Sequence, residues 1–250
     1  MERTKVFNNN GVDVLSAGYV EEANDLFRAA LETKLAHDRA EIEGCTDASR
    51  CVTPECVFLA EYHMNNKRLY MKNPKRAPGN LSLMSNGGFL LSRGIDENNK
   101  KRSPSAYLYS KAFSIEDAHF EKIQYASALN IFNLGLVHHL DDPSCNRARS
   151  FYEVAASLLA IDPWDEESSL LRAALTSNFA VWAYENGEMA VSRAALVELG
   201  RMVIAWPGKP EHRAGFQLNL SLLQMMEEDE EDDEEEECDV NSIQDLREED

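Results

Sequence analysis

Three cysteines and two histidines in the first quarter of the chain have side chains that could bind a metal ion. Cys45, Cys51 and Cys56 have five and four residues between them, and His37 and His63 flank the group. Closed structural zinc sites use tight Cys-x-x-Cys pairs or regularly spaced Cys and His pairs, because four ligands must reach one tetrahedral centre. These spacings fit such a site poorly. We therefore expect reduced thiols here, with no metal and no cofactor.

A second candidate for metal binding is the adjacent pair His138 and His139. Consecutive residues of a helix point about 100° apart, so these two rings cannot converge on one ion. Packing explains the pair better: we expect His138 at a contact between helices and His139 facing outward. The pair therefore adds no metal site to the prediction.

Sequence motifs that indicate catalysis or nucleotide binding are absent. The chain has no Gly-x-x-x-x-Gly-Lys phosphate loop, no Gly-x-Gly-x-x-Gly turn, no His-Glu-x-x-His helix and no Gly-x-Ser-x-Gly elbow. We therefore expect no catalytic residue and a non-enzymatic function. A nucleophile assembled from distant residues leaves no motif, so an enzyme with a site in the segment 39–116 stays an alternative.

Charge is distributed unevenly along the 250 residues, whose formal net charge is −19. Residues 227–250 hold 16 of the 44 acidic residues and one of the 25 basic residues, which leaves a net of −4 for residues 1–226. This tail begins with eleven consecutive acids. Self-repulsion and the lack of apolar side chains predict that the tail is disordered. Two roles are open for the tail. The first is to increase solubility, and the second, more specific one is to bind a basic surface.

The segment 39–116 has the opposite charge, because its part 64–105 holds nine basic and two acidic residues. Two short runs in the segment, 89–91 and 107–109, are apolar or aromatic and bounded by Gly or Pro, which predicts a small β-hairpin. The basic patch consists of Lys72, Lys75, Arg76, Lys100, Lys101 and Arg102. A flexible tail is long enough to reach this patch, and we hypothesise an intramolecular contact between the two. Nucleic acid is a disfavoured partner. A nuclear-import signal in the same clusters is only weakly indicated, since short basic runs are common on loops.

The apolar residues do not predict a membrane protein. No stretch approaches 18 consecutive apolar residues, and the polar start of the sequence has no apolar segment behind it. We expect a reducing compartment, with the cytoplasm as the location and the nucleus as the alternative that the basic clusters leave open. A body of 226 residues is long enough to bury a core without disulfides.

Apolar residues recur at three- and four-residue spacing in three stretches, which predicts amphipathic helices. A glycine or a turn composition interrupts each stretch, so each is expected to fold back on itself as a helical hairpin. We expect hairpins at about 5–38, 117–160 and 166–204, a capping helix at 212–225 and an insertion at 39–116. Together, residues 5–226 form one all-α domain, followed by the disordered tail 227–250.

The three hairpins share a pattern of small and aromatic residues. The first has Asn10-Gly11 on its first helix and Ala23, Phe27 and Ala30 on its second. The others repeat these positions with Asn133-Leu134-Gly135, Ala148, Tyr152 and Ala155, and with Asn178-Phe179-Ala180, Ser192, Leu196 and Leu199. The small residues let two helices cross closely. This pattern resembles the tetratricopeptide-repeat family, and the phrases 129–140 and 215–219 are similar to uncharacterised repeat-like proteins of diatoms.

The resemblance implies stacked hairpins with a concave face that is lined by their first helices and binds partners. Carried over to this chain, the groove residues are Asn8, Val12, Leu15, Phe132, Leu136, His139, Ser177, Val181 and Tyr184. The set is mainly apolar, which suits an apolar peptide or helix. The carboxylate clamp of chaperone adaptors is not matched, because Val12 and Leu136 stand where its asparagines would be. Alternatively, the inserted strands cover this face and make these residues part of the core.

The sequence therefore favours a non-enzymatic protein–protein interaction module, an adaptor or scaffold, that binds a protein or peptide partner on its first-helix face. An alternative from a different class is an acidic-tailed binder or chaperone of basic partners, in which the tail makes the contact. Salt separates the two hypotheses, because contacts made by the tail weaken steeply with ionic strength and apolar contacts barely change.

Overall fold

The computed structural model of the chain describes residues 1–41, 81–83, 88–91, 106–121, 123–159, 166–205 and 212–221. Helices make up most of these residues, which confirms the all-α class predicted from the sequence. The helices are α1 (Glu2–Ser16), α2 (Val20–Glu41), α4 (Ile123–Asp141), α5 (Asn146–Leu159), α6 (Glu166–Glu185) and α7 (Met189–Ile204), and a further helical segment covers residues 212–221.

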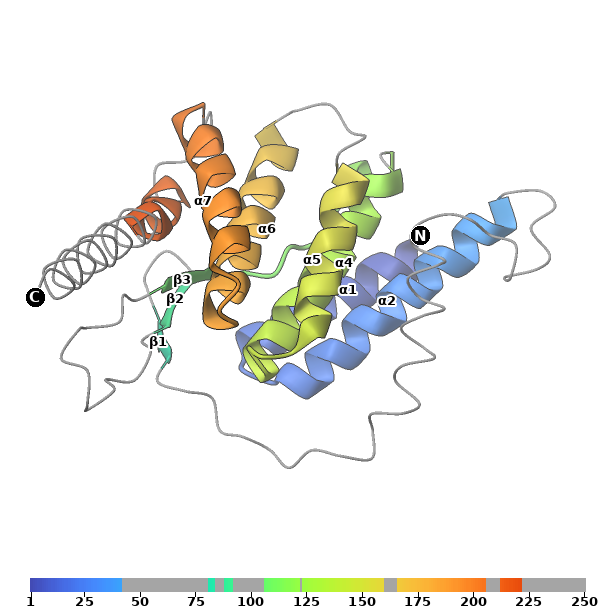
Figure 1. Ribbon diagram of the computed structural model, residues 1–250. Coiled ribbons are helices and arrows are strands. Elements are labelled where there is room, and N and C mark those ends of the chain that lie inside the picture. Colours follow the sequence, from blue (N-terminus) through green and yellow to red (C-terminus); the bar gives the residue numbers. More distant parts are fainter. Residues whose placement is uncertain are drawn as a thin grey trace, which may run out of the picture.

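The labelled helices form three pairs that follow one another across the molecule in chain order: α1 with α2, α4 with α5, and α6 with α7 (Figure 1). Glycines make two of the turns between paired helices. Gly18 and Gly187 have φ angles of +90° and +77°, in the left-handed region where other residues are strained. The chain can therefore reverse within a few residues, so that the second helix of the pair lies along the first.

A glycine on the first helix of two pairs lies against an aromatic ring on the second. A Cβ atom on Gly11 would lie 2.7 Å from the ring of Phe27, and one on Gly135 would lie 2.8 Å from the ring of Tyr152. Both aromatic side chains are buried. A larger side chain at either glycine would push the helices apart, because a packed interior has no spare volume.

One hydrophobic core runs through all three pairs. It includes Phe27 from α2, Phe132 from α4, Tyr152 from α5, Trp182 from α6 and Phe216 from the last helical segment. A single pair leaves one apolar face uncovered, so each pair is stabilised by the neighbour that covers this face.

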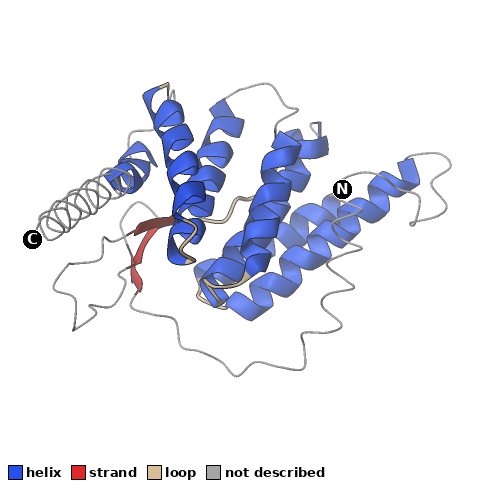
Figure 2. Cartoon of the chain, viewed as in Figure 1, coloured by secondary structure: helices blue, strands red, loops and turns tan. Residues whose placement is uncertain are grey.

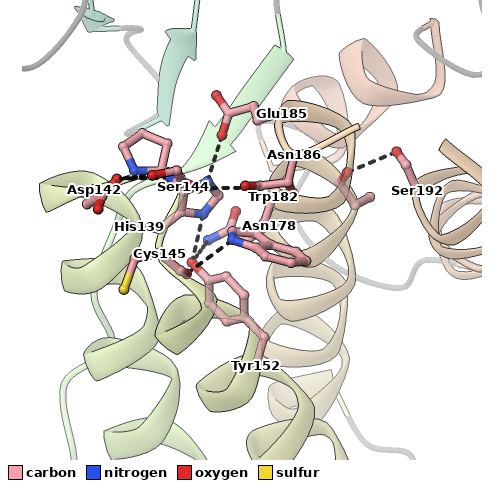
Figure 3. Close-up of polar contacts among 12 residues, drawn as sticks. His139, Asp142, Ser144, Cys145, Tyr152, Asn178, Trp182, Glu185, Asn186 and Ser192 are labelled. Carbon is pink, nitrogen blue, oxygen red and sulfur yellow. Dashed lines mark hydrogen bonds and ion pairs between the residues drawn. The ribbon is translucent and has the colours of Figure 1, made fainter. Parts of the chain in front are cut away.

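Polar contacts fasten the second pair to the third, next to the turn between α4 and α5 (Figure 3). The indole N–H of Trp182 donates to the carbonyl oxygen of Cys145 at 3.2 Å. The guanidinium of Arg149 pairs with Glu188 at 2.9 Å and lies over the Trp182 ring. These contacts hold α6 beside α4 and α5, and α4 and α6 both carry residues of the candidate site.

Three short strands, β1 (Leu81–Leu83), β2 (Gly88–Leu91) and β3 (Ala106–Tyr109), pair antiparallel in the order β1-β2-β3. Phe89 lies opposite Leu108 in this register, and Leu90 lies opposite Tyr107. After β3 the chain continues without helix or strand through residue 116, turns in the 3-10 helix η2 (Asp117–Glu121) and enters α4. Figure 2 shows this segment leaving the strands and running toward the middle helix pair.

Several sequence predictions fall on residues outside those described, namely Cys45, Cys51, Cys56, the six residues of the basic patch and the acidic tail. Within the described ranges, no group of three His, Cys, Asp or Glu side chains is arranged to hold a metal ion. Among the helices that the structure describes, none is long and apolar enough to cross a membrane.

Candidate functional site

An extended segment of the chain lies across the first helices, and four asparagines hold its backbone. We refer to residues 106–116 as the strap, and to Asn9, Asn133, Asn178 and Asn219 as the asparagine ladder. The side-chain oxygen of each ladder residue accepts the N–H of one strap residue. Its side-chain nitrogen donates to the carbonyl of the same strap residue. Each asparagine thus satisfies both polar backbone groups of one residue.

The amino-terminal half of the strap is held by the last helices. Asn219, on the segment 212–221, bonds the N–H and the carbonyl of Tyr107, both at 2.7 Å. Asn178, on α6, bonds the N–H of Tyr109 at 2.8 Å and its carbonyl at 3.0 Å. Both asparagines are buried, so these bonds form where water competes little for the same groups.

The carboxyl-terminal half of the strap is held by the first two pairs. Asn133, on α4, bonds the N–H and the carbonyl of Phe113, both at 2.8 Å. Asn9, on α1, bonds the N–H of Ile115 at 2.8 Å and its carbonyl at 3.1 Å. Asn8 donates a further bond to the Phe113 carbonyl at 2.9 Å and accepts one from Asn133 at 3.0 Å. The strap therefore connects all three pairs and the last helical segment.

The geometry of an extended chain explains which strap residues the ladder contacts. The N–H and the carbonyl of one residue point to the same edge of an extended chain, and alternate residues share that edge. Tyr107, Tyr109, Phe113 and Ile115 fall on this period. An asparagine side chain offers one acceptor and a donor, as a neighbouring strand does, so the ladder takes the place of a strand on this edge. Lys111 shares the period, but it is exposed, and none of the hydrogen bonds made by the four ladder asparagines goes to it.

The ladder occupies one recurring position of the sequence, and our sequence analysis missed its role. Each ladder asparagine stands two residues before a small residue of its helix. The four pairs are Asn9 and Gly11, Asn133 and Gly135, Asn178 and Ala180, and Asn219 and Ser221. The predicted repeat pattern includes Asn133 and Asn178 beside their small residues but assigns them no contact, and in the first hairpin it uses Asn10 instead of Asn9. The recurrence of the ladder asparagines at a fixed offset from a small residue, which is buried in the first three cases, is the signal that could have revealed them.

The strap side chains fill closely fitting spaces. Tyr107, Leu108, Tyr109 and Ile115 are all buried. The ring of Tyr109 stacks between Phe113 and Phe216, with ring centres 5.6 Å and 5.7 Å away. A Cβ atom on Gly215 would lie 2.4 Å from the Tyr107 ring, so only glycine leaves room for that ring. The ladder holds the backbone, and these surfaces hold the side chains.

Burial also determines the ionisation of the strap tyrosines. Removal from water raises the pKa of Tyr107 to about 12, because the phenolate would lose its hydration. Burial raises the pKa of Tyr109 as well, and the neighbouring Tyr107 adds to the effect. Both phenols are therefore neutral at physiological pH. The Tyr107 hydroxyl has no hydrogen-bond partner in the described part of the chain, so its recognition depends on the ring.

A buried polar cluster lies beside the ladder and is joined to it through Asn178 (Figure 3). His139 contacts the Tyr152 hydroxyl through Nδ1 at 3.2 Å and Glu185 through Nε2 at 3.0 Å. The side-chain nitrogen of Asn178 lies 3.5 Å from the same hydroxyl. Burial raises the pKa of Tyr152, so its phenol stays protonated. The cluster therefore provides a fixed polar contact that orients the Asn178 side chain toward the strap.

The prediction that His139 faces outward is wrong, because this side chain is only 1% exposed. The family resemblance assigned His139 to the first-helix face, and helix geometry directed it away from His138, but neither showed which side chains cover it. The ring packs on Tyr152 from α5, with ring centres 5.9 Å apart, and reaches Glu185 at the end of α6. The neighbour His138 is buried too and stacks on Phe151, as expected for a residue at a contact between helices.

The structure brings three of the predicted groove residues to the strap. Asn8 bonds the Phe113 carbonyl, the Phe132 ring lies 5.2 Å from the Phe113 ring, and Ser177 accepts a bond from Asn219 at 2.7 Å. The other six pack against or within the core: Leu136, His139 and Val181 are buried, and Val12, Leu15 and Tyr184 are partly buried. The first-helix face thus carries the chain's own strap.

Comparisons with known proteins add no relative to this description. A scan against protein-family models finds no match, and searches of curated proteins and of solved structures find none either.

Proposed function

We propose that the protein is a non-enzymatic interaction module, built from tetratricopeptide-type hairpins, that holds an extended polypeptide along its first-helix face. The observation that carries this proposal is the asparagine ladder, in which four side-chain amides each bond the N–H and the carbonyl of one residue in an extended segment. Close helix crossings at Gly11 and Gly135 support the hairpin type, since small residues at these positions are what the family pattern requires.

The ladder distinguishes between the two partner shapes that an apolar groove suits, a helix and an extended peptide. A helix uses its own N–H and carbonyl groups in internal hydrogen bonds, so it has none to offer to a row of amides. An extended peptide leaves both groups of alternate residues available on one edge. Binding of this kind resembles the addition of a strand to a sheet, where the backbone supplies affinity and side-chain pockets supply specificity.

The chemistry of the ladder also favours binding over catalysis. Asparagine amides do not titrate, and they supply neither a nucleophile nor a general base. The tyrosines next to them are buried and protonated. Fixed, neutral donors and acceptors are what a binding surface for backbone groups requires.

A binding experiment on the full chain tests the proposal. Tyr107→Ala with Tyr109→Ala loosens the strap and leaves the ladder in place. A labelled peptide with the sequence of residues 104–117 should then bind this variant, as measured by fluorescence anisotropy. Adding Asn178→Ala should weaken that binding at least about tenfold, because a buried N–H and a buried carbonyl lose their partners.

A matched substitution on α1 serves as the control. Asn10 is adjacent to the ladder residue Asn9 but exposed, so Asn10→Ala should leave binding unchanged whereas Asn9→Ala should weaken it. Failure of the peptide to bind a folded, loosened variant would contradict the proposed function.

A further inference from the structure

We infer that the strap is a built-in occupant of the ladder that a partner replaces. The partner is an extended segment of another protein with large apolar side chains at the four positions that match Tyr107, Tyr109, Phe113 and Ile115. This inference rests on the proposed function. Beyond that function, it specifies the sequence pattern of the bound peptide, the direction in which the peptide lies, and the strap as its competitor.

The hydrogen bonds of the ladder do not depend on strap sequence. All eight bonds between ladder and strap end on backbone N–H or carbonyl groups. Any extended peptide other than one with proline at a contacted position presents the same groups. A foreign segment can therefore replace the strap without loss of these bonds. The spaces that hold the strap side chains then determine which partner sequences bind.

The spacing of the ladder sets the register of the partner. The contacted residues 107, 109, 113 and 115 are separated by steps of two, four and two residues. An extended chain advances about 6.6 Å over two residues and about 13 Å over four. The longer step spans from α6 to α4, where Lys111 is exposed and the ladder bonds go to Tyr109 and Phe113 on either side of it. The matching position of a partner therefore accepts any side chain, including a charged one.

The surfaces around the strap define which side chains fit. Gly215 leaves room for a flat ring at the first position, and Tyr109 stacks between two further rings at the second. Phe113 meets Phe132 edge to face at the third position, and Ile115 is completely buried at the fourth. The pattern of the partner is aromatic-x-aromatic-x-x-x-aromatic-x-aliphatic. Its amino-terminal end lies at the segment 212–221, and its carboxyl-terminal end lies at α1.

The covalent tether makes the strap a strong competitor. A segment joined to its own groove acts at an effective concentration on the order of millimolar, so a free peptide at micromolar concentration is largely excluded. Next to the carboxyl-terminal end of the strap, Asp117 pairs with Lys5 of α1 at 2.9 Å, and its carboxylate side chain is 80% exposed. Exposed ion pairs contribute little. This end is therefore held mainly by the bonds of Asn9 and the burial of Ile115, which the backbone and the aliphatic side chain of a partner would replace.

Hydrogen exchange of the unmodified full chain tests whether the strap can leave. The amides of Tyr107, Tyr109, Phe113 and Ile115 should exchange through a local opening, at least about tenfold faster than the amides in the middle of α4 and α6. Exchange of the strap amides at the rate of global unfolding would show that the strap is a permanent part of the core, and would overturn the inference. This measurement requires no variant.

Peptide binding tests the register. The loosened variant, Tyr107→Ala with Tyr109→Ala, is titrated with the peptide 104–117 and with two altered peptides. If the double variant does not fold, the single variant Ile115→Ala is used in its place. Deleting the residue at position 111 shifts the last two anchors out of register and should weaken binding at least about tenfold. Replacing Lys with Glu at the same position keeps the register and should change binding by less than about twofold.

Equal binding of the deletion peptide would overturn the inferred pattern while leaving the proposed function intact, because the groove would then hold extended peptides without regard to register. Absence of binding by all three peptides to a folded variant would instead contradict the proposed function itself. The unmodified chain should bind the parent peptide at least about tenfold more weakly than the loosened variant. Equal affinities would show that the strap does not compete.

Discussion

Within each helix pair the closest contacts are apolar and depend on shape, whereas between the first helices and the strap they are hydrogen bonds to the backbone. Gly11 and Gly135 leave no space beyond that of a hydrogen atom against Phe27 and Tyr152. The ladder bonds, in contrast, require only an extended chain. The helix pairs are therefore specific for their own sequence, and the ladder is tolerant of sequence. In the exchange inferred above, this difference is the reason why a partner would replace the strap and not a helix.

The largest expected effect comes from emptying the interior of a pair. Phe27→Ala should lower the free energy of unfolding by about 4 kcal/mol, since it removes a fully buried ring and leaves a cavity. Urea denaturation measures the change. If the helix pairs and the strap are held independently, the strap amides of Phe27→Ala should lose no more protection from hydrogen exchange than the helix amides do. A selective loss at the strap would show that the pairs and the strap are not independent.

The next largest effect is a dependence of stability on pH that arises between two helices. Burial, together with the charge of Arg147, lowers the pKa of His138 to about 4 from its ordinary 6.5. Between these values the unfolded chain binds a proton that the folded chain excludes. The stability is therefore complete above about pH 6.5 and falls as the pH drops toward 4, by up to about 3 kcal/mol. Denaturation at several pH values measures this slope.

Substitution of His138 isolates this contribution. His138→Gln removes the titrating ring and should flatten the slope between pH 6.5 and 4, whatever its effect on stability at neutral pH. A slope that persists unchanged in the variant would assign the pH dependence to other groups.

Removing one rung of the ladder should have a smaller and more local effect. Asn178→Ala should lower the free energy of unfolding by about 2 kcal/mol, because the buried N–H and carbonyl of Tyr109 lose their partners. Hydrogen exchange should show the loss first at the strap. Asn10→Ala, at an exposed position of α1, is the matched control and should change neither measurement.

Two glycine substitutions compare a crowded helix position with an open one. Gly135→Ala should destabilise by about 1 kcal/mol net, since overpacking against Tyr152 exceeds the gain in helix propensity. A Cβ atom on Gly200 would lie 3.7 Å from its nearest neighbour, an ordinary contact. Gly200→Ala should therefore stabilise by roughly 0.5 kcal/mol through propensity alone. Thermal or urea denaturation measures the change in the free energy of unfolding of each variant. Changes of the same sign in the two variants would contradict the packing argument.

The smallest effect should come from the Tyr107 hydroxyl. Tyr107→Phe keeps the ring against Gly215 and removes a buried hydroxyl that has no partner among the described residues. The free energy of unfolding should stay the same or rise by up to about 1 kcal/mol. A clear loss of stability would show that the hydroxyl is bonded, and that the strap is recognised by more than its backbone and ring shapes.

Much of the scaffold could be predicted because its signals are local. Helical periodicity indicated the all-α class, and the turn glycines Gly18 and Gly187 do adopt the left-handed conformation that only glycine accepts readily. The Gly and aromatic positions of the first two hairpins match the repeat pattern that the chain resembles, and in the structure each glycine lies against its aromatic ring. These features depend on residues close in sequence or on a repeated offset.

The candidate site could be predicted only in outline. The resemblance to the tetratricopeptide-repeat family implied one face that holds Asn8, Phe132 and Ser177, and all three lie at the strap or its ladder. The alternative that the inserted segment covers this face agrees with the position of the strap, which belongs to the predicted insertion 39–116 and contains β3. The sequence did not indicate how the strap is held, and the prediction that His139 faces outward was wrong. Asparagine has no apolar periodicity of its own, so a ladder residue is hard to distinguish from an ordinary polar residue until its partner is known.

The sequence by itself determined the helices, their turns and the small residues at which they cross, because each of these depends on conformational preferences of neighbouring residues. Only the tertiary structure decided the use of the first-helix face. Asn9 and Asn219 bond strap residues 106 and 112 positions away in the chain. No local preference encodes such contacts. They exist because the stacked pairs bring four distant amides into line, at a spacing that an extended backbone can follow.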